Sequence, residues 1–405
     1  MRRSIPLLAS LLLAAGCDDE PAPIEPSLPG SQSHLVVCTG QEELGDTWQL
    51  ALAARAVQLD DAGNVYLTGS HAAPCAANES FSGSWTLLTK IGAKGDVQWV
   101  RGWSEHVAIT VAPSGEAMAV GEERVDLVGA DGAILVQRPA GTPPSAIGAA
   151  EGAFLFAGSY AHEDRIAFGD WSFETASRGG LFVITLDRQL VPYEVRQPPP
   201  YDAAVSEVLA VAALSDGDLV NVHHDIDAGN RLTISRSGAR SWAVTDLERT
   251  PEATLHVLDD DSIVVHAGPR LSRYADDGVL LWSRDYRDAL PYEANRTFSS
   301  NPAGGGRIVA ATNGAALTIA FMVRSDSAIE TSDGPVVPDG ADIGFAQIDV
   351  ASGLPLELTL EPLAGHQHAT AAAMAADGSL VVATSSDEPG AGSGYRLTRH
   401  ATTLP

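Results

Sequence analysis

Two short groups of side chains have the residue types and spacing of metal ligands. His366 and His368 stand two positions apart, which places both imidazoles on one face of a β-strand. Asp225 and Asp227 offer alternating carboxylate oxygens before Gly229, in the manner of a calcium loop. Neither group is complete, because the histidines lack a third ligand and the loop lacks its closing acid. We therefore predict no metal or other cofactor, with calcium at Asp225 and Asp227 as the alternative.

Motifs for covalent or acid–base catalysis are absent from the sequence. The segment Gly392-Ser393-Gly394 is a Gly/Ser loop and lacks the Gly-x-Ser-x-Gly spacing of a nucleophile elbow. Paired carboxylates for glycoside cleavage could come from any of the 52 acidic residues, and their spacing singles out none. No catalytic residue is predicted, and the sequence favours a protein that is not an enzyme.

The N-terminus carries a chemically informative cysteine. Arg2 and Arg3 precede an apolar run over residues 5–13, too short for a membrane-spanning helix and typical of a cleaved export signal. The following Leu13-Ala14-Ala15-Gly16-Cys17 resembles the bacterial lipobox, although Ala14 stands where that family most often has leucine. The resemblance implies acylation of the Cys17 thiol and cleavage before it, so that residues 1–16 are a lipoprotein signal peptide. The alternative is an ordinary secretory signal whose cleavage site falls near a cysteine.

The segment after the signal is a solvated tether. Residues 17–33 are rich in proline and acids, contain no aromatic residue and cannot bury a core. In a polyproline conformation such a segment reaches about 50 Å. We therefore expect a globular part, residues 34–405, that stands off a bilayer in the cell envelope and faces the periplasm or the exterior. Inner and outer membranes remain equally open.

The remaining two cysteines suggest a disulfide. If Cys17 is acylated, Cys38 and Cys75 form an even pair in an oxidising compartment. A bond between them would pin the start of the globular part to the segment around Cys75. The alternative is two separate thiols, which exported proteins seldom keep.

The charge balance limits the partners. With 52 acidic and 25 basic residues the net charge is −27. Such a surface repels phosphate backbones and anionic lipid headgroups, which excludes nucleic acid as an expected partner. The lipid on Cys17 would thus supply the only membrane attachment. We expect a monomer whose partner is an envelope protein or glycan.

The rest of the chain has the pattern of an all-β fold. Apolar runs of four to seven residues alternate with Gly, Asp and Asn turns, and no amphipathic helix of ten residues follows the signal. In the clearest unit two hairpins follow each other, at residues 54–69 and 85–100. The first hairpin recurs at 111–121, 148–158, 212–222, 256–268, 302–312 and 374–384. The second recurs at 127–138, 184–195, 234–244, 272–284 and 347–358. Long insertions separate some strands, at 71–84 and 324–344.

The two ends of the chain complement each other. The last unit stops at 394–400 after a third strand, and the segment 45–52 looks like a fourth strand without its first three. A strand from the N-terminus that completes the last blade is the usual closure of a β-propeller and removes exposed sheet edges. We predict seven four-stranded blades, with six or eight as alternatives. Two β-sandwiches would not explain the complementary ends.

The repeated units also support a family resemblance. The strand pair ending in Asn64-Val-Tyr-Leu-Thr-Gly69, followed by a Gly-x-x-x-Trp strand, resembles the seven-bladed propeller repeats of exported bacterial lipoproteins and, distantly, quinoprotein-like propellers. Under that resemblance the tryptophans pack between blades and do not stack on ligands; they are Trp48, Trp99, Trp242 and Trp282. The expected function is a non-catalytic binding or scaffold module at the envelope. The alternative is an envelope hydrolase or lyase with its active site in the propeller funnel.

Overall fold

The computed structural model describes most of the chain after residue 32. The described residues are 33–39, 42–52, 54–69, 86–161, 165–175, 179–197, 205–225, 231–247, 253–286, 290, 308–323, 328–332, 334–337, 342–361, 367–386 and 394–400. Within them the secondary structure is almost entirely β-strand, and no helix there is long and apolar enough to cross a membrane.

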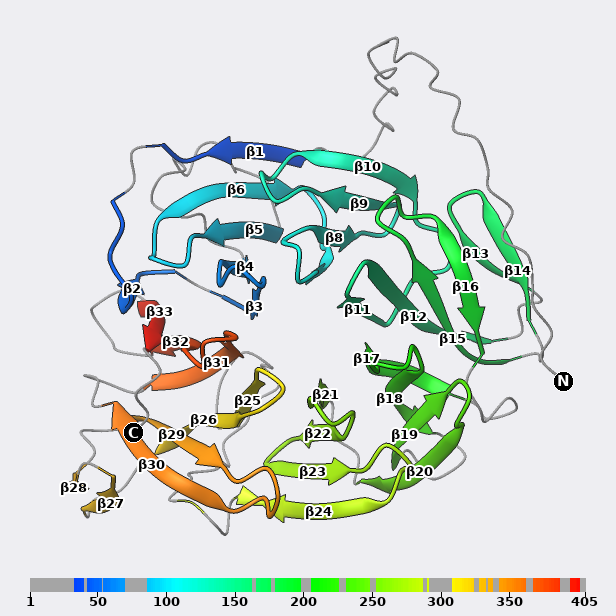
Figure 1. The fold of residues 1–405 in the computed structure, drawn as a ribbon. Helices are drawn as coiled ribbons and strands as arrows, with labels where there is room; N and C mark the ends of the chain where they lie inside the picture. The colour runs from blue at the N-terminus through cyan, green and yellow to red at the C-terminus, as the bar shows by residue number, and fades with distance from the viewer. Residues whose placement is uncertain are drawn as a thin grey trace, which may run out of the picture. The chain divides into compact units, whose positions relative to one another are not determined.

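The described strands form seven antiparallel sheets arranged as the blades of a propeller (Figure 1), each with four blade strands and one with a fifth strand at its outer edge. Blade 1 consists of β3 (Ala56–Leu59), β4 (Val65–Gly69), β5 (Thr86–Ile91) and β6 (Val97–Trp103). Blade 2 consists of β7 (Ala108–Val111), β8 (Ala117–Val120), β9 (Arg124–Val128) and β10 (Ile134–Pro139). Blade 3 consists of β11 (Ala146–Ala150), β12 (Ala153–Ala161), β15 (Gly179–Leu186) and β16 (Pro192–Arg196). The predicted all-β, seven-bladed propeller is therefore confirmed.

The other four blades repeat this order from the inside of the ring outward. Blade 4 consists of β17 (Val205–Ala213), β18 (Leu219–Asp225), β19 (Arg231–Ser237) and β20 (Trp242–Leu247). Blade 5 consists of β21 (Ala253–Val257), β22 (Ile263–Ala267), β23 (Arg270–Tyr274) and β24 (Leu280–Asp285). Blade 6 consists of β25 (Val309–Thr312), β26 (Leu317–Val323), β29 (Asp342–Ile348) and β30 (Pro355–Glu361). Blade 7 consists of β31 (Gln367–Met374), β32 (Leu380–Ser386), β33 (Gly394–His400) and β2 (Trp48–Leu50).

Blade 7 closes the ring as the sequence predicts. The strand β2, from the N-terminal part of the chain, pairs antiparallel with β33, and Trp48 lies opposite Arg399 in that register. The closing strand is shorter than the predicted segment 45–52. The inner strand β31 of blade 7 also packs against β3, the inner strand of blade 1.

Three features of the strand arrangement differ from the sequence prediction. The strand β1 (Ser33–Val37) adds to the outer edge of blade 1 by pairing with β6, so this sheet has five strands. Two additional hairpins lie between second and third strands, in blade 3 and blade 6. They are β13 (Arg165–Phe168) with β14 (Trp171–Glu174), and β27 (Ile329–Thr331) with β28 (Gly334–Val336).

The predicted hairpin at 302–312 is wrong. Residues 309–312 form the first strand of blade 6, and its partner β26 follows them instead of preceding them. The turn lies at Asn313 and Gly314, where the Asn313 side-chain oxygen accepts the backbone N–H groups of Ala315 and Ala316 at 3.2 and 2.9 Å. Gly314 has a φ of 93°, which favours glycine. The prediction placed the turn at the glycines 304–306, whereas the turn between β25 and β26 lies at the Asn-Gly pair.

At four described interfaces, a cationic side chain and a tryptophan of one blade donate to the same backbone carbonyl of the next blade. We call each such pair a latch. At the ring closure Arg399 Nη1 and Trp48 Nε1 both donate to the backbone carbonyl of Ala93 in blade 1, at 3.0 and 3.1 Å. The same arrangement, at 2.7–3.0 Å, occurs at three more described interfaces: Lys90 and Trp99 on Ala130, Arg236 and Trp242 on Asp276, and Arg273 and Trp282 on Val350. The predicted blade-packing role of the four tryptophans is confirmed.

Each arginine of a latch also binds the first hairpin of its own blade. Arg236 donates from Nε to Asp218 at 2.8 Å and forms an ion pair with Asp216, and Arg399 pairs with Asp377. Burial by itself would raise the pKa of Asp218, but backbone N–H groups and the Arg236 guanidinium lower it overall. In blade 4 the turn before the tryptophan strand joins the same group, because the backbone N–H of Ala239 donates to Asp218 at 2.9 Å.

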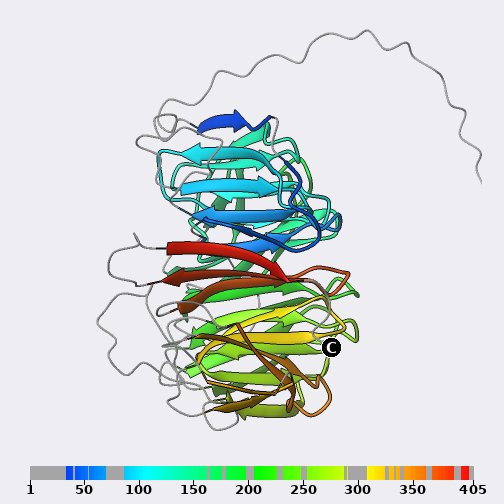
Figure 2. The ribbon, with the colours of Figure 1, turned by 90° about the vertical axis from the view of Figure 1, so that its left-hand side faces the viewer.

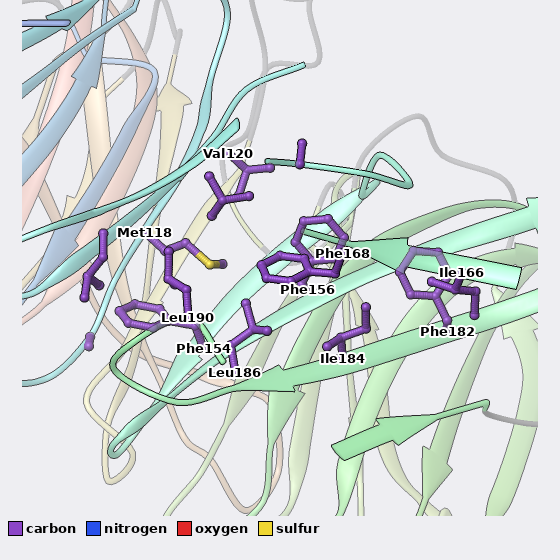
Figure 3. Packing of buried hydrophobic residues seen from close by; sticks show 14 of the residues in the cluster. Met118, Val120, Phe154, Phe156, Ile166, Phe168, Phe182, Ile184, Leu186 and Leu190 are labelled. Atoms are coloured by element: carbon purple, nitrogen blue, oxygen red, sulfur yellow. The ribbon is translucent and has the colours of Figure 1, made fainter. Parts of the chain in front are cut away.

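Interfaces without a latch use other packing. Between blades 2 and 3 an aromatic cluster fills the space, and Figure 3 shows Phe154, Phe156 and Phe168 pointing toward Met118 and Val120. Phe156 meets Phe168 edge-on, with ring centroids 5.0 Å apart. Buried aromatic side chains stabilise such a contact through both area and ring geometry.

The ring has two different ends. At the turn end, tight hairpins join first to second strands and third to fourth strands. At the loop end, the chain passes from second to third strands and from blade to blade, and the long insertions occur there. Figure 2 shows the ring edge-on, with the strands running between these two ends.

Candidate functional site

Several residues singled out in the sequence lie outside the described residues. They are Cys17, Cys75, Asp227 and His366. Cys38 follows β1, and its backbone N–H donates to the carbonyl of Gln98 at 2.8 Å, beside blade 1. The acylation of Cys17 and the Cys38–Cys75 disulfide therefore stay predictions.

The described metal candidates are far apart in the fold. Asp225 ends β18 in blade 4 and His368 begins β31 in blade 7, and each is 8% exposed. Across the described part of the chain, no group of three or more His, Cys, Asp or Glu side chains is placed to hold a metal ion. Since Asp227 and His366 are not described, both metal hypotheses remain predictions of the sequence.

A pocket opens at the loop end between the inner strands of blades 1 and 2. Its volume is about 280 Å³, and it is lined by Arg55, Thr68, Gly69, Thr86, His106, Val107 and Ala108. Arg55 precedes β3, and residues 106–108 lead into β7. Thr86 Oγ1 accepts the backbone N–H of Val107 at 3.2 Å, which ties the two walls together. We refer to it as the mouth pocket.

Further along β3 and β7, an amide side chain bridges blades 1 and 2. Gln58 on β3 donates from Nε2 to the carbonyl of Ile109 at 3.2 Å and accepts the backbone N–H of Val111 at 2.6 Å. The Gln58 side chain thus binds one backbone C=O and one backbone N–H of β7, as a neighbouring strand would. The pocket walls are therefore fixed to each other by hydrogen bonds on two levels.

A second polar group lies on blade 5, where two imidazoles share one hydroxyl. Thr254 Oγ1 lies 3.2 Å from His256 Nε2 and 3.3 Å from His266 Nδ1, and His266 Nε2 lies 2.7 Å from the carbonyl of Gly268. Burial lowers the pKa of both histidines to about 4, so both are neutral at pH 7. The carbonyl requires an Nε2–H on His266, which makes its Nδ1 an acceptor for the Thr254 hydroxyl. Thr254 then accepts from His256 Nε2, and the lone pair of His256 Nδ1 remains available.

Blade 4 buries a third polar group against blade 3. His223 Nδ1 lies 2.8 Å from Asn221 Oδ1, which also accepts Ser235 Oγ at 3.1 Å. Burial lowers the pKa of His223 to about 4. Since an amide oxygen only accepts, His223 carries its proton on Nδ1, and Nε2 has no hydrogen-bond partner among the described residues. Buried polar atoms of this kind usually bind ordered water.

A shallow hollow of about 510 Å³ lies beside the ring closure. It is lined by Thr47, Trp48, Gln49, Glu361, Thr398, Arg399 and His400. Glu361 Oε2 lies 3.5 Å from His400 Nε2. Burial raises the pKa of Glu361 and lowers that of His400, so the surroundings favour the uncharged form of both groups. Trp48 and Arg399 already donate to Ala93 at the ring closure, so we assign the hollow to the closure and not to a ligand site.

Sequence reasoning missed Arg55, His256 and His266. The mouth pocket combines the ends of four strands from two blades, and the imidazole pair depends on the register that places Thr254 opposite His266. No short motif contains these residues together. A single arginine before a strand, such as Arg55, does not indicate a binding site in the sequence, because the pocket also requires residues of the neighbouring blade.

Known proteins resemble this chain only distantly. No family model and no curated protein matches the chain. Similar solved structures include a chain of the "Mitotic Checkpoint Complex" (10% identity, covering 98% of this chain and 99% of that one, TM-score 0.49). "BBS1N in complex with ARL6DN" has 12% identity over 91% and 97% of the two chains, with a TM-score of 0.47. A "protein of unknown function from Bacteroides caccae" has 12% identity over 69% and 92%, with a TM-score of 0.40. At these identities nothing about function follows.

Proposed function

We propose that this protein is a non-catalytic binding module of the cell envelope, a propeller tethered to a membrane by acyl chains on Cys17. The observation that carries the proposal is the mouth pocket, a hydrogen-bonded hollow with an Arg55 side chain at the loop end. The latched turn end supplies a rigid frame. Recognition residues typically lie on the loops that such a frame positions.

Membrane attachment rests on the lipobox-like segment that ends at Cys17 and on the Pro-rich segment after it. A lipid anchor with a tether of about 50 Å would let the propeller reach partners near the bilayer without inserting into it. Labelling with a radioactive fatty acid tests this part. The label should appear on the protein and vanish in Cys17→Ala, which should leave the membrane fraction; a Cys17→Ala protein that stays membrane-bound contradicts the anchor.

Site-specific photo-cross-linking tests the binding role. A benzoylphenylalanine residue at Ser104, in the connection beside the mouth pocket, should yield adducts with an envelope protein or glycan in intact cells. The matched control is Glu151, an exposed turn-end residue of blade 3. Adducts that form equally from Glu151, or only from Glu151, would contradict a loop-end binding site.

A second candidate, an envelope hydrolase or lyase, is favoured by one observation. The available Nδ1 of neutral His256 is the kind of atom that could accept a proton from a substrate or water. Purified protein incubated with envelope polysaccharides and peptides should then release products, and His256→Gln should abolish the release. Under the binding proposal no product is released. If the protein releases products and the His256→Gln variant does not, the enzyme candidate replaces the binding proposal.

A further inference from the structure

The mouth pocket has an unusual charge for this protein. Arg55 and His106 are among its lining residues, together with Thr68 and Thr86, and none of the described residues that line it is acidic. The whole chain nevertheless carries 52 acidic against 25 basic residues. Arg55 is therefore a positive charge at the pocket of a predominantly acidic chain.

Two acidic side chains close in sequence to the pocket lining, Glu105 and Asp60, have partners outside the pocket. Glu105, directly before His106, accepts the backbone N–H of Glu122 at 3.1 Å and lies 3.8 Å from Arg124 Nε, so it belongs to blade 2. Asp60, at the other end of β3, accepts both the backbone and the side-chain amide of Asn64 at 2.9 and 2.8 Å.

Arg55 itself has no side-chain hydrogen bond or ion pair among the described residues, although its backbone N–H donates to Thr68 O at 2.7 Å. Its backbone is therefore fixed while its guanidinium remains available. A guanidinium is a planar fork of donors that matches a carboxylate in two parallel hydrogen bonds. Thr68 also lines the pocket, and its hydroxyl can bind hydroxyl or carbonyl groups of the same ligand.

The size and the surrounding charge narrow the ligand class. A volume of about 280 Å³ accommodates a molecule of monosaccharide size, below the range of most drug-sized ligands. Polyanions would meet the repulsion of a chain with net charge −27, whereas a single carboxylate can be offset locally by one arginine. We infer that the mouth pocket binds a small ligand with one carboxylate, held by Arg55. This inference rests on the proposed binding function.

Ligand-observed NMR and calorimetry on the purified full-length protein test the inference. The probes are D-glucuronate, N-acetylalanylalanine as a peptide carboxylate, glucose as the neutral counterpart of glucuronate, and citrate as a polyanion. Either monocarboxylate should bind more tightly than glucose and citrate. Which of the two binds distinguishes a sugar acid from a peptide terminus as the source of the carboxylate.

Arginine variants locate the binding. Arg55→Gln should weaken monocarboxylate binding about ten- to a hundredfold, the range expected for losing a charge-assisted hydrogen bond. Arg55→Lys should restore part of it, since the charge remains without the fork. The control is Arg165→Gln, which removes an exposed arginine from the loop-end hairpin of blade 3 and should leave affinity unchanged.

Two results would overturn the inference: no saturation by either monocarboxylate up to about 10 mM, well above useful affinity, or equal binding by the Arg55→Gln protein. The cross-linking experiment separates this failure from failure of the binding function. If Arg55→Gln still forms the Ser104 adduct in cells, the module binds its partner without the carboxylate contact.

Discussion

Trp48 and Arg399, near opposite ends of the chain, donate to the same backbone oxygen of Ala93 in a third segment. They lie opposite each other in the β2–β33 register, so the indole and the guanidinium reach blade 1 side by side. Three chain segments distant in sequence thus meet at one carbonyl group. This contact holds the ring closed, and the other latches repeat it between blades that are adjacent in sequence.

Trp48→Ala should lower the free energy of unfolding by about 3–5 kcal/mol, because it deletes a buried indole that is 4% exposed. Trp48→Phe should cost less, since the packing is largely kept and one hydrogen bond is lost. Urea unfolding followed by circular dichroism measures both. Tyr193→Ala is the control, because Tyr193 is 62% exposed and its removal should change stability by less than about 0.5 kcal/mol. A Trp48→Ala protein as stable as this control would refute the role of the latch.

Gly95→Ala and Gly152→Ala should separate backbone strain from the latch contact. Both glycines have positive φ, 89° and 72°, so each alanine variant bears a similar backbone cost of about 1 kcal/mol. A Cβ at Gly95 would lie 2.8 Å from Trp48 Cγ, whereas a Cβ at Gly152 would meet no atom within 4 Å. Gly95→Ala should therefore be clearly the more destabilising in chemical denaturation. Equal losses would mean that the indole does not cover this turn.

The buried His223 should make stability fall in acid. Its pKa is lowered by burial to about 4 in the folded protein, whereas an unfolded histidine titrates near 6.5. Between these values the unfolded chain binds more protons, so stability is fully present above about pH 6.5 and decreases as the pH falls toward 4. The loss from His223 alone is about 3 kcal/mol at pH 4.

His223→Gln, which can still donate to Asn221, should remove that part of the pH dependence. Denaturant unfolding at pH 7, 5.5 and 4.5 compares it with the unchanged protein. His34→Gln serves as the matched control on the exposed side of β1. If the His223→Gln protein keeps the full acid loss, the titration comes from other groups.

The predicted disulfide between Cys38 and Cys75 should be found by mass spectrometry of the unreduced protein. Reduction, or Cys38→Ser, should lower the free energy of unfolding by about 2–4 kcal/mol, because the bond restricts the unfolded chain. Cys38 lies beside blade 1 through its hydrogen bond to Gln98, so reduction should loosen β1 before it opens the ring. Two alkylatable thiols in the unreduced, freshly purified protein would contradict the prediction.

Local chemistry in the sequence determined the strands and their pairing within blades. Alternating apolar runs and Gly or Asp turns act over a few residues, so hairpins such as 54–69 and 272–284 were readable from the sequence. The failure at 302–312 has the same origin, because three glycines and an Asn-Gly pair compete as turn signals and only the blade's register decides between them. The closing strand could be predicted because the count of strands left one place empty.

Only the tertiary structure decided which side chains act together. The shared carbonyl of Ala93, the fork of Arg55 beside Thr68, and the Thr254 hydroxyl between His256 and His266 all arise where separate strands or blades approach. Such contacts depend on the register and the packing angle of whole sheets, and a short sequence pattern encodes neither. Local sequence therefore specifies the strands, whereas the mouth pocket exists only where blade 1 packs against blade 2.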